Sequence, residues 1–324
     1  MSAFAVSMLA GLVALVLLSF IVEGLRPRPK RPESLPWGPG IAVKYAEICG
    51  IRVRYLKTGA GPNLVLLHTL RTQLDIFQKV IPDLAGTFTV YSYDYPGHGW
   101  SDIPDADYAP EDFYRWTAAF LDALDIERAT LVGISIGGTI ALVLAARANP
   151  RIDRVIAINP YDYWPVGSIR RSSTVARLIL GPAGVPILGA TLMRLRSRYV
   201  SDRIMEGGVA RADALSPALK KELYDVGARP RHYQAFLRLL SHEALWADGR
   251  KAYADIGIPT LLVYGNKDWA PVAMRERARA LIPGVTMTTI EGGGHFLSLD
   301  RPRDLTGLIT RFIADASGTR ATTI

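Results

Sequence analysis

A single serine stands at a position suited to nucleophilic chemistry, in the segment Gly133-Ile134-Ser135-Ile136-Gly137. The apolar run before it predicts a buried strand, and the small residues after it predict the start of a helix. Glycines on both sides allow the tight turn that lifts a serine hydroxyl above the edge of a sheet. The amide of Ile136 would point the same way and is a candidate oxyanion donor. The competing interpretation is a glycine-rich turn in which the serine is incidental.

A nucleophilic serine needs a histidine as its base, and that histidine needs a carboxylate to orient it. Among the five histidines, His295 alone follows a strand downstream of Ser135, after three glycines that allow its loop to reach the serine. Asp268 follows another expected strand and is the candidate acid, because hydrolases with this type of turn have the order serine, aspartate, histidine. Asp162, which follows the strand after Ser135, is the alternative acid.

Alternating strands and helices are expected to bring these residues to one edge of a sheet. This alternation predicts a mostly parallel sheet with right-handed crossovers, and therefore an α/β fold. Two alternating segments around Gly50 predict a further strand pair near the start. The other expected strands are 63–68, 88–94, 129–135, 154–160, 260–265 and 285–292, and the expected helices are 73–84, 110–124, 136–150 and 296–314.

The alternation stops between residues 161 and 253. This stretch is helical in pattern, rich in arginine and broken by Gly and Pro, and the strand patterns resume at Pro259. We therefore expect a helical cap inserted over the strand ends, with an independent helical domain or a long crossover as the alternatives. Residues 175–200 are apolar with flanking arginines, so they are expected to rest at a membrane interface, to cover an acyl tunnel, or simply to pack on the core.

The amino terminus carries an uncharged, strongly apolar run over residues 3–22. Twenty helical residues span about 30 Å, the thickness of a hydrocarbon core, so residues 1–24 are predicted to form a transmembrane anchor in the lipid bilayer. A basic, proline-rich spacer follows at 25–40, and its charges predict a single-pass protein of the cell membrane with a cytoplasmic catalytic domain. A cleaved signal, which would give a secreted or periplasmic protein, and a buried core helix are the alternatives.

The overall composition restricts the possible partners. The chain has 324 residues and a net charge of +8, but its basic residues are scattered, which argues against nucleic-acid binding. Cys49 is the only cysteine, so no disulfide can form within the chain. No Cys and His cluster has the spacing of metal ligands, and the chemistry predicted above requires neither a metal nor a cofactor.

Four segments, taken in order, resemble the α/β-hydrolase fold superfamily: the turn DYPGHGWSD, the serine segment GISIG, the acid loop GNKDWAPV, and GGGHFLSLDRP. The resemblance runs from about residue 42 to residue 314, apart from the cap. It implies a mostly parallel central sheet flanked by helices, with a helical cap inserted after the strand that follows Ser135. The chain then divides into the anchor 1–24, the spacer 25–40, the core 41–160 and 254–316, the cap 161–253 and a tail, 317–324.

The resemblance also implies the second oxyanion donor. Family members usually have His-Gly where this chain has His68-Thr69, and the next amide completes the oxyanion site; here that amide belongs to Leu70, with Thr69 as the fallback. Glycine accepts backbone angles that threonine resists, so this position departs from the family pattern. The residues expected to line the substrate pocket are His68, Phe77, Trp269 and Phe296.

The predicted reaction is acyl transfer through Ser135, Asp268 and His295, on an ester or thioester of a hydrophobic or lipid-like acid. Dehalogenases and epoxide hydrolases of this fold use an aspartate at the position of Ser135, so an alkyl-enzyme is not expected here. The alternatives are other chemistry on the same triad (a carbon–carbon bond hydrolase, a perhydrolase or an acyltransferase) and a non-catalytic, membrane-anchored binding protein.

Overall fold

The computed structural model describes residues 2–163 and 169–318; cap residues 164–168 and tail residues 319–324 lie outside this part. Eight strands form one sheet in the order β1-β2-β4-β3-β5-β6-β7-β8. The pairs β1–β2 and β2–β4 are antiparallel and the remaining neighbours are parallel. The strands are β1 (Lys44–Ile48), β2 (Ile51–Thr58), β3 (Asn63–Leu67), β4 (Thr89–Tyr93), β5 (Ala129–Ile134), β6 (Ile152–Ile158), β7 (Thr260–Gly265) and β8 (Thr286–Ile290).

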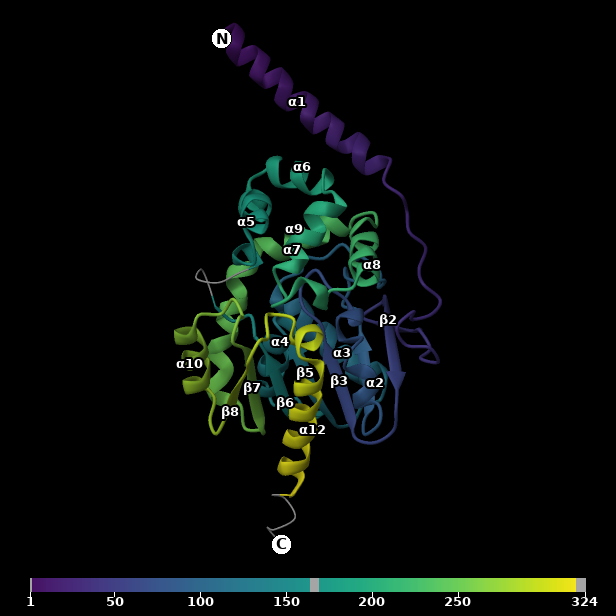
Figure 1. Cartoon of the computed structure of the whole chain (residues 1–324), viewed down its shortest axis with the longest axis vertical. Coiled ribbons are helices and arrows are strands. Elements are labelled where there is room, and N and C mark those ends of the chain that lie inside the picture. The colour runs from purple at the N-terminus through teal and green to yellow at the C-terminus, as the bar shows by residue number, and fades with distance from the viewer. Residues whose placement is uncertain (1, 164–168, 319–324) are drawn as a thin grey trace.

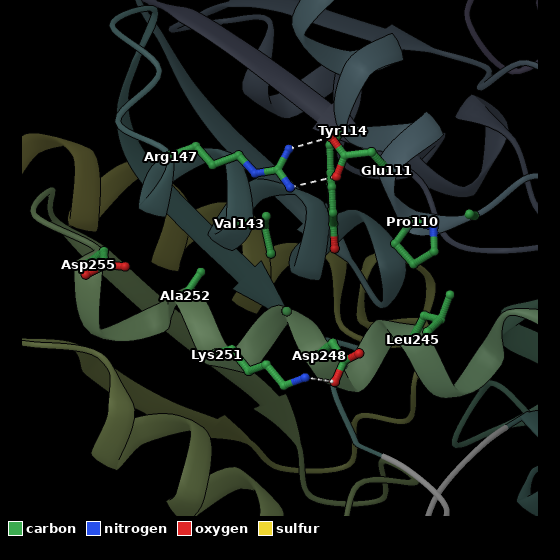
Figure 2. Close-up of a pocket in the computed structure, with 12 residues that line it drawn as sticks. Pro110, Glu111, Tyr114, Val143, Arg147, Leu245, Asp248, Lys251, Ala252 and Asp255 are labelled. Carbon is green, nitrogen blue, oxygen red and sulfur yellow. Dashed lines mark hydrogen bonds and ion pairs between the residues drawn. The ribbon is translucent and has the colours of Figure 1, made fainter.

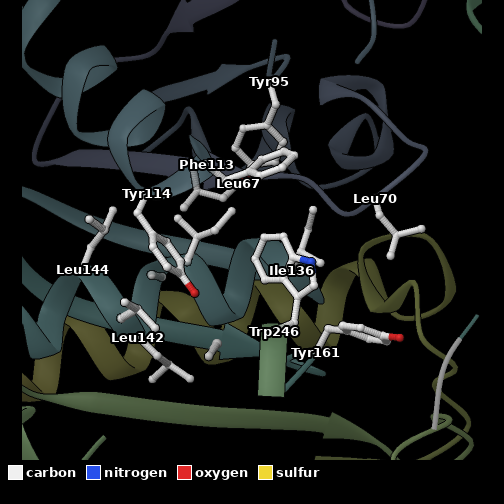
Figure 3. Packing of buried hydrophobic residues seen from close by; sticks show 14 of the residues in the cluster. Leu67, Leu70, Tyr95, Phe113, Tyr114, Ile136, Leu142, Leu144, Tyr161 and Trp246 are labelled. Atoms are coloured by element: carbon white, nitrogen blue, oxygen red, sulfur yellow. The ribbon is translucent and has the colours of Figure 1, made fainter. Parts of the chain in front are cut away.

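The central strands are buried on both faces, as their continuous apolar sequences predict. Leu64 and Leu66 of β3 pack into one hydrophobic cluster, while Val65 and Leu67 pack into the other. The first cluster is covered by α2 (Ile81–Leu84), α11 (Leu297–Asp300) and α12 (Pro302–Gly318), and the second by α3 (Pro110–Ala123), α4 (Ile136–Ala146) and α10 (Val272–Leu281). Figure 3 shows part of the second cluster, in which Leu67 of β3 and Ile136 of α4 lie with Trp246. The sheet and its covering helices confirm the α/β fold expected from the sequence.

Two expected helices are broken in the structure, and a proline explains each break. The expected helix 73–84 is a short 3-10 turn, η1 (Leu74–Phe77), followed by α2, in which Pro82 occupies an early helical position. The expected helix 296–314 is divided into α11 and α12 at Arg301-Pro302. A proline cannot donate the helical hydrogen bond and disfavours helical angles in the residue before it, so each helix must begin close to its proline.

A helical insertion lies between β6 and β7, over the carboxyl ends of the strands (Figure 1). Serines begin three of its helices: Ser173, Ser197 and Ser216 each accept a hydrogen bond from an amide of the first turn. The insertion contains the helices α5 (Thr174–Leu180), α6 (Leu188–Arg194), α7 (Arg198–Glu206), α8 (Pro217–Gly227) and α9 (His232–Ser241), and the 3-10 segments η2 (Ile169–Arg171), η3 (Gly181–Gly184), η4 (Ala212–Ala214) and η5 (Glu243–Asp255).

The amino-terminal helix α1 (Ala3–Gly24) projects from the molecule beside the cap (Figure 1). By length and composition it could cross a membrane, and within it only Ser19 is buried. Its carboxyl-terminal end contacts α6 of the cap, where Arg194 Nε donates to Ser19 Oγ at 2.8 Å. The Glu23 carboxylate pairs with Arg196 at 2.8 Å, and Arg26 donates to the main-chain oxygens of Arg194 and Arg196. The end of α1 is therefore fixed to the cap by polar contacts.

Candidate active site

Ser135 occupies a strained turn between β5 and α4. Its backbone angles are φ 59° and ψ −118°, a region that residues other than glycine adopt at a cost. The turn closes tightly because its neighbours are small: a Cβ on Gly133 would lie 2.1 Å from the carbonyl carbon of Gly137, and one on Gly137 would lie 2.3 Å from Leu67 O. The two glycines thus allow the strained turn, as the sequence predicts.

His295 and Asp268 are brought together from the loops after β8 and β7. His295 Nδ1 lies 2.6 Å from Asp268 Oδ1, and the other carboxylate oxygen accepts from the amide of Ala270 at 2.9 Å. The Trp269 ring stacks on the imidazole, with centroids 3.8 Å apart and an angle of 11° between planes. A carboxylate on one side and an indole on the other therefore fix the orientation of the His295 ring.

The candidate nucleophile and base atoms, Ser135 Oγ and His295 Nε2, are both unsatisfied. Ser135 is 0% exposed and His295 1% exposed. Within the described part of the chain, neither Ser135 Oγ nor His295 Nε2 has a hydrogen-bond partner. Buried polar atoms are nearly always paired, and exceptions concentrate where chemistry occurs. An imidazole held through Nδ1 leaves Nε2 free to accept a hydroxyl proton, which is the requirement for general-base catalysis.

Asn159 ties the loops of the site together, and the sequence analysis did not identify it. Its side-chain nitrogen donates to Gly294 O at 3.1 Å and to His295 O at 2.9 Å, while its oxygen accepts from the Gly265 amide at 2.9 Å. The loops after β6, β7 and β8 are thereby linked through one buried side chain. The only local signal was a polar residue at the end of an apolar strand.

The candidate oxyanion donors have free amides. Ile136 is the first residue of α4, where helical amides lack partners within the helix. In the described part of the chain neither its amide nor that of Leu70 donates a backbone hydrogen bond. Thr69 does not adopt a positive φ; the left-handed residue of this loop is Arg71, at φ 59°. The missing glycine therefore does not strain position 69.

The four expected pocket residues differ in their surroundings. His68 accepts from the Tyr95 amide through Nε2 at 3.1 Å, and its Nδ1 lies 2.8 Å from Thr69 O, so both ring nitrogens are engaged. Burial lowers the pKa of His68 to about 3, which keeps the ring neutral. Phe77 is buried in the cluster that contains α2 and α12. Trp269 and Phe296 adjoin His295, and the Phe296 amide donates to Gly208 O of the cap at 2.7 Å.

The alternative acid, Asp162, is engaged elsewhere. Its two carboxylate oxygens accept from Arg250 Nη2 at 2.9 Å and from Tyr253 OH at 3.0 Å. Burial raises its pKa although the Arg250 charge opposes the change. Asp268, not Asp162, therefore contacts His295 in this structure.

A buried ion network supports the loop that carries Leu70. Arg54 is 0% exposed, and its guanidinium donates to Asp94 Oδ2 at 2.6 Å and to Asp75 Oδ2 at 2.5 Å. The two carboxylates raise the pKa of Arg54, although burial opposes this. Asp94 also accepts from the Leu74 amide, and Asp75 accepts from Trp37 of the spacer. This network has no local signal in the sequence because its members are 19 to 40 residues apart.

An open surface pocket of about 500 Å³ lies away from these residues, between α3, α4 and η5 (Figure 2). It contains the ion pairs Arg147–Glu111 and Lys251–Asp248 and no residue of the predicted triad. Among residues 2–163 and 169–318, no group of three or more His, Cys, Asp or Glu side chains is placed to hold a metal ion.

The sheet order, the strained serine turn and the loop positions define a class of protein. A sequence profile described as alpha/beta hydrolase fold matches residues 62–302, and the chain belongs to that family.

Relatives in this family carry several names. The chain is 28% identical over 298 residues to an uncharacterized protein of Mycobacterium tuberculosis, covering 88% of this chain and 84% of the relative. It is 26% identical to haloalkane dehalogenase 2 of the same organism, with 81% and 91% covered. It is 27% identical to 2-hydroxymuconate semialdehyde hydrolase of a Pseudomonas species, with 82% and 92% covered.

Solved structures share the fold at lower identity. A structure titled as a membrane phospholipase A superposes with a TM-score of 0.72 at 21% identity. The match covers 97% of this chain and 96% of that one, so the superposed part includes most of the amino-terminal segment as well as the sheet and the cap.

Proposed function

We propose that this protein is a serine hydrolase that cleaves an ester or thioester of a hydrophobic acid through an acyl-enzyme at Ser135. One observation carries the proposal: His295 Nδ1 is held by Asp268 at 2.6 Å, while His295 Nε2 and Ser135 Oγ are both buried without a partner. A carboxylate, an imidazole and a serine on a strained turn are the parts of a nucleophilic triad.

The reaction proceeds in two balanced steps. His295 Nε2 takes the proton of Ser135 as Oγ attacks the carbonyl carbon, and the oxyanion is stabilised by the amides of Ile136 and Leu70. His295 then gives that proton to the departing alcohol or thiol, which leaves an acyl group on Ser135. Water, deprotonated by His295, attacks the acyl carbon; the acid is released and Oγ regains its proton.

A lipid-like substrate is supported by the apolar surface beside the cap. The side chains of α1 are exposed along most of its length, and the adjoining part of the cap also exposes Leu178 (68%) and Ile187 (65%). Apolar surface of this kind suits a lipid interface better than water. The similarity in fold to a membrane phospholipase A agrees with this proposal. We propose that α1 is retained as a single-pass anchor in the cell membrane and that the catalytic part lies in the cytoplasm, since basic residues follow the helix.

Other reactions in this family differ in the nucleophile that they require at position 135. A haloalkane dehalogenase forms an alkyl-enzyme on a carboxylate, and this chain has a serine hydroxyl there. A serine triad can also carry out carbon–carbon bond hydrolysis, perhydrolysis and acyl transfer to an alcohol. Carbon–carbon bond hydrolysis is the alternative that the similarity to 2-hydroxymuconate semialdehyde hydrolase supports. Product analysis with water, alcohol and peroxide acceptors distinguishes these reactions.

A fluorophosphonate probe tests the central assignment. Full-length protein in non-ionic detergent should be labelled at Ser135, whereas Ser135→Ala should not be labelled. Ser241→Ala, at an exposed serine that donates only to its own helix, is the matched control and should be labelled normally. Folded wild-type protein that is not labelled would identify a binding protein instead of an enzyme.

An ester panel and a mass measurement test the substrate and the anchor. We expect hydrolysis to increase with acyl chain length and with added liposomes. The intact mass of protein from the membrane fraction should include residues 1–24. A mature chain that begins after Gly24 in the soluble fraction would support signal cleavage.

A further inference from the structure

Arg71 is a cation without a counter-ion beside the candidate oxyanion site. It directly follows Leu70, and its φ of 59° makes it the left-handed residue of this loop. No carboxylate in the described part of the chain pairs with its guanidinium, although the group lies over the Phe236 ring at 5.0 Å. An aromatic face attracts a cation but does not neutralise it. The arginine therefore remains electrostatically unsatisfied.

The cavity beneath the cap that contains Arg71 holds a second cation. Arg71 and Arg196 line a narrow cavity of about 30 Å³ together with Met193, Met205 and Phe236. Both guanidiniums approach Gly227: its carbonyl accepts from Arg196 Nη2 at 2.6 Å, and a Cβ there would lie 2.9 Å from Arg71 Nη2. Glu23 compensates Arg196, and no equivalent acid compensates Arg71.

A buried, unpaired imidazole nitrogen lies at the start of α9, the helix that also carries Phe236 of the Arg71 cavity. His232, at the start of α9, is 3% exposed, and its Nδ1 has no hydrogen-bond partner in the described residues. Burial and the charge of Arg71 lower the pKa of His232 well below its usual range. Burial and the charges of Arg196 and Arg26 lower the pKa of Arg71 to about 9. An anion bound at Arg71 would oppose the change in the pKa of Arg71.

We propose that Arg71 forms an anion subsite under the cap that binds a carboxylate or phosphate group carried by the substrate. The inference rests on the proposed ester hydrolysis and narrows its substrate class to anionic amphiphiles. The methionine and phenylalanine side chains of the cavity would contact the apolar part of such a substrate, because methionine adapts its shape readily. A guanidinium binds both oxyanions through paired hydrogen bonds.

Two matched pairs of esters test the subsite on the full-length protein in non-ionic detergent. The carboxylate pair is a nitrophenyl ester of a long acid that ends in a carboxylate, and the same ester ending in a methyl group. The phosphate pair is a monoacylglycerol phosphate and the corresponding monoacylglycerol. In each pair the ratio of kcat/KM for the anionic to the uncharged ester is measured. For wild-type protein we expect this ratio to be at least about tenfold in one of the two pairs. The pair that shows the preference tells whether the subsite binds a carboxylate or a phosphate.

Variants assign the preference to Arg71. Arg71→Gln should reduce the anionic-to-uncharged ratio about tenfold or more, while Arg71→Lys should retain part of it. Arg177→Gln removes the same charge from the exposed surface of the cap and should change the ratio less than about twofold. An equal ratio in wild type and Arg71→Gln would overturn the proposal, as would a wild-type protein that hydrolyses both members of each pair equally well.

A second measurement does not depend on a variant that folds. A long-chain fatty acid should inhibit the wild-type protein at least about tenfold more strongly than the alcohol of the same chain length, and equal inhibition would refute the subsite. Failure of the proposed function gives a different result, because neither ester pair would then be hydrolysed and Ser135 would not react with fluorophosphonate.

Discussion

Replacing Asp268 by asparagine tests the geometry of the site most directly. One carboxylate oxygen accepts from the Ala270 amide at 2.9 Å, and the other faces His295 Nδ1 at 2.6 Å. In Asp268→Asn the carboxamide oxygen would keep the Ala270 hydrogen bond, so its NH₂ group would face Nδ1. Nδ1 must then accept, the imidazole proton moves to Nε2, and Nε2 can no longer accept the proton of Ser135.

The expected loss follows from this change of tautomer. The equivalent substitution in a serine triad reduces kcat by about 10⁴-fold, which corresponds to about 5.5 kcal/mol of transition-state stabilisation. Asparagine has nearly the shape of aspartate and keeps the Ala270 hydrogen bond, so we expect little change in the thermal unfolding midpoint. The assay is kcat for a nitrophenyl ester together with the rate of fluorophosphonate labelling, measured on protein whose fold is checked by circular dichroism.

Asp162→Asn is the matched control because it changes the competing carboxylate in the same way. It removes the counter-charge of the largely buried Arg250, which keeps its hydrogen bond to Met274 O, and should cost about 3–5 kcal/mol in the free energy of unfolding. Its folded fraction should keep kcat within about tenfold of wild type, because Asp162 does not contact His295. If Asp162→Asn abolishes turnover and Asp268→Asn does not, the assignment of the acid is wrong.

Three further predictions concern stability. Ser135→Gly should have a free energy of unfolding about 1 kcal/mol higher than Ser135→Ala, and therefore a higher urea midpoint, because glycine accepts the φ of 59° without strain. Equal urea midpoints would contradict this. Gly133→Ala should destabilise the fold by about 3 kcal/mol or more in the same experiment, since its Cβ would lie 2.1 Å from a backbone carbon, and a fully stable variant would exclude the close turn. The pKa of His68 and of His98 is about 3 in the folded chain and about 6.5 when unfolded, so the unfolded state binds more protons below pH 6.5. Stability should therefore fall as the pH falls from about 6.5 toward 3, by about 1.4 kcal/mol per pH unit for each ring, and His68→Gln should reduce this slope in urea titrations at several pH values.

The sequence predicted the features that depend on local patterns. The strands β3, β5 and β7 are short apolar runs between turn residues, and the turn at Ser135 is recognisable because glycines lie two residues before and after the serine. The order of Ser135, Asp268 and His295 then predicted which loops should meet, and the structure brings Asp268 and His295 into contact. The predicted roles of these residues and the predicted division of the chain into anchor, spacer, core, cap and tail remain predictions.

The features that the sequence did not reveal depend on distant partners. Asn159 looks like any polar residue at the end of a strand, and its importance comes from contacts with loops more than 100 residues away. Arg54 lies in a strand with ordinary alternation, although its side chain is buried between two aspartates. Arg71 has no sequence pattern that indicates its contact with Phe236 of the cap, which lies more than 160 residues away. The break before Pro302 is different, because the proline is a local signal, although the helical pattern continues across it.

Through the contact between Glu23 and Arg196, the amino-terminal helix supplies the negative charge that compensates a buried arginine of the cap. A soluble fragment that begins after Gly24 would lack the carboxylate, and Arg196 would remain buried against Met193 O and Gly227 O with its charge uncompensated. The same contact acts as a mechanical linkage, since a change in the tilt of the helix in a bilayer would pull directly on the cap through Glu23, Arg26 and Ser19. We therefore expect a shortened enzyme to differ from the full-length one in ligand affinity as well as in location, so kinetic constants measured without the helix would describe a different cap.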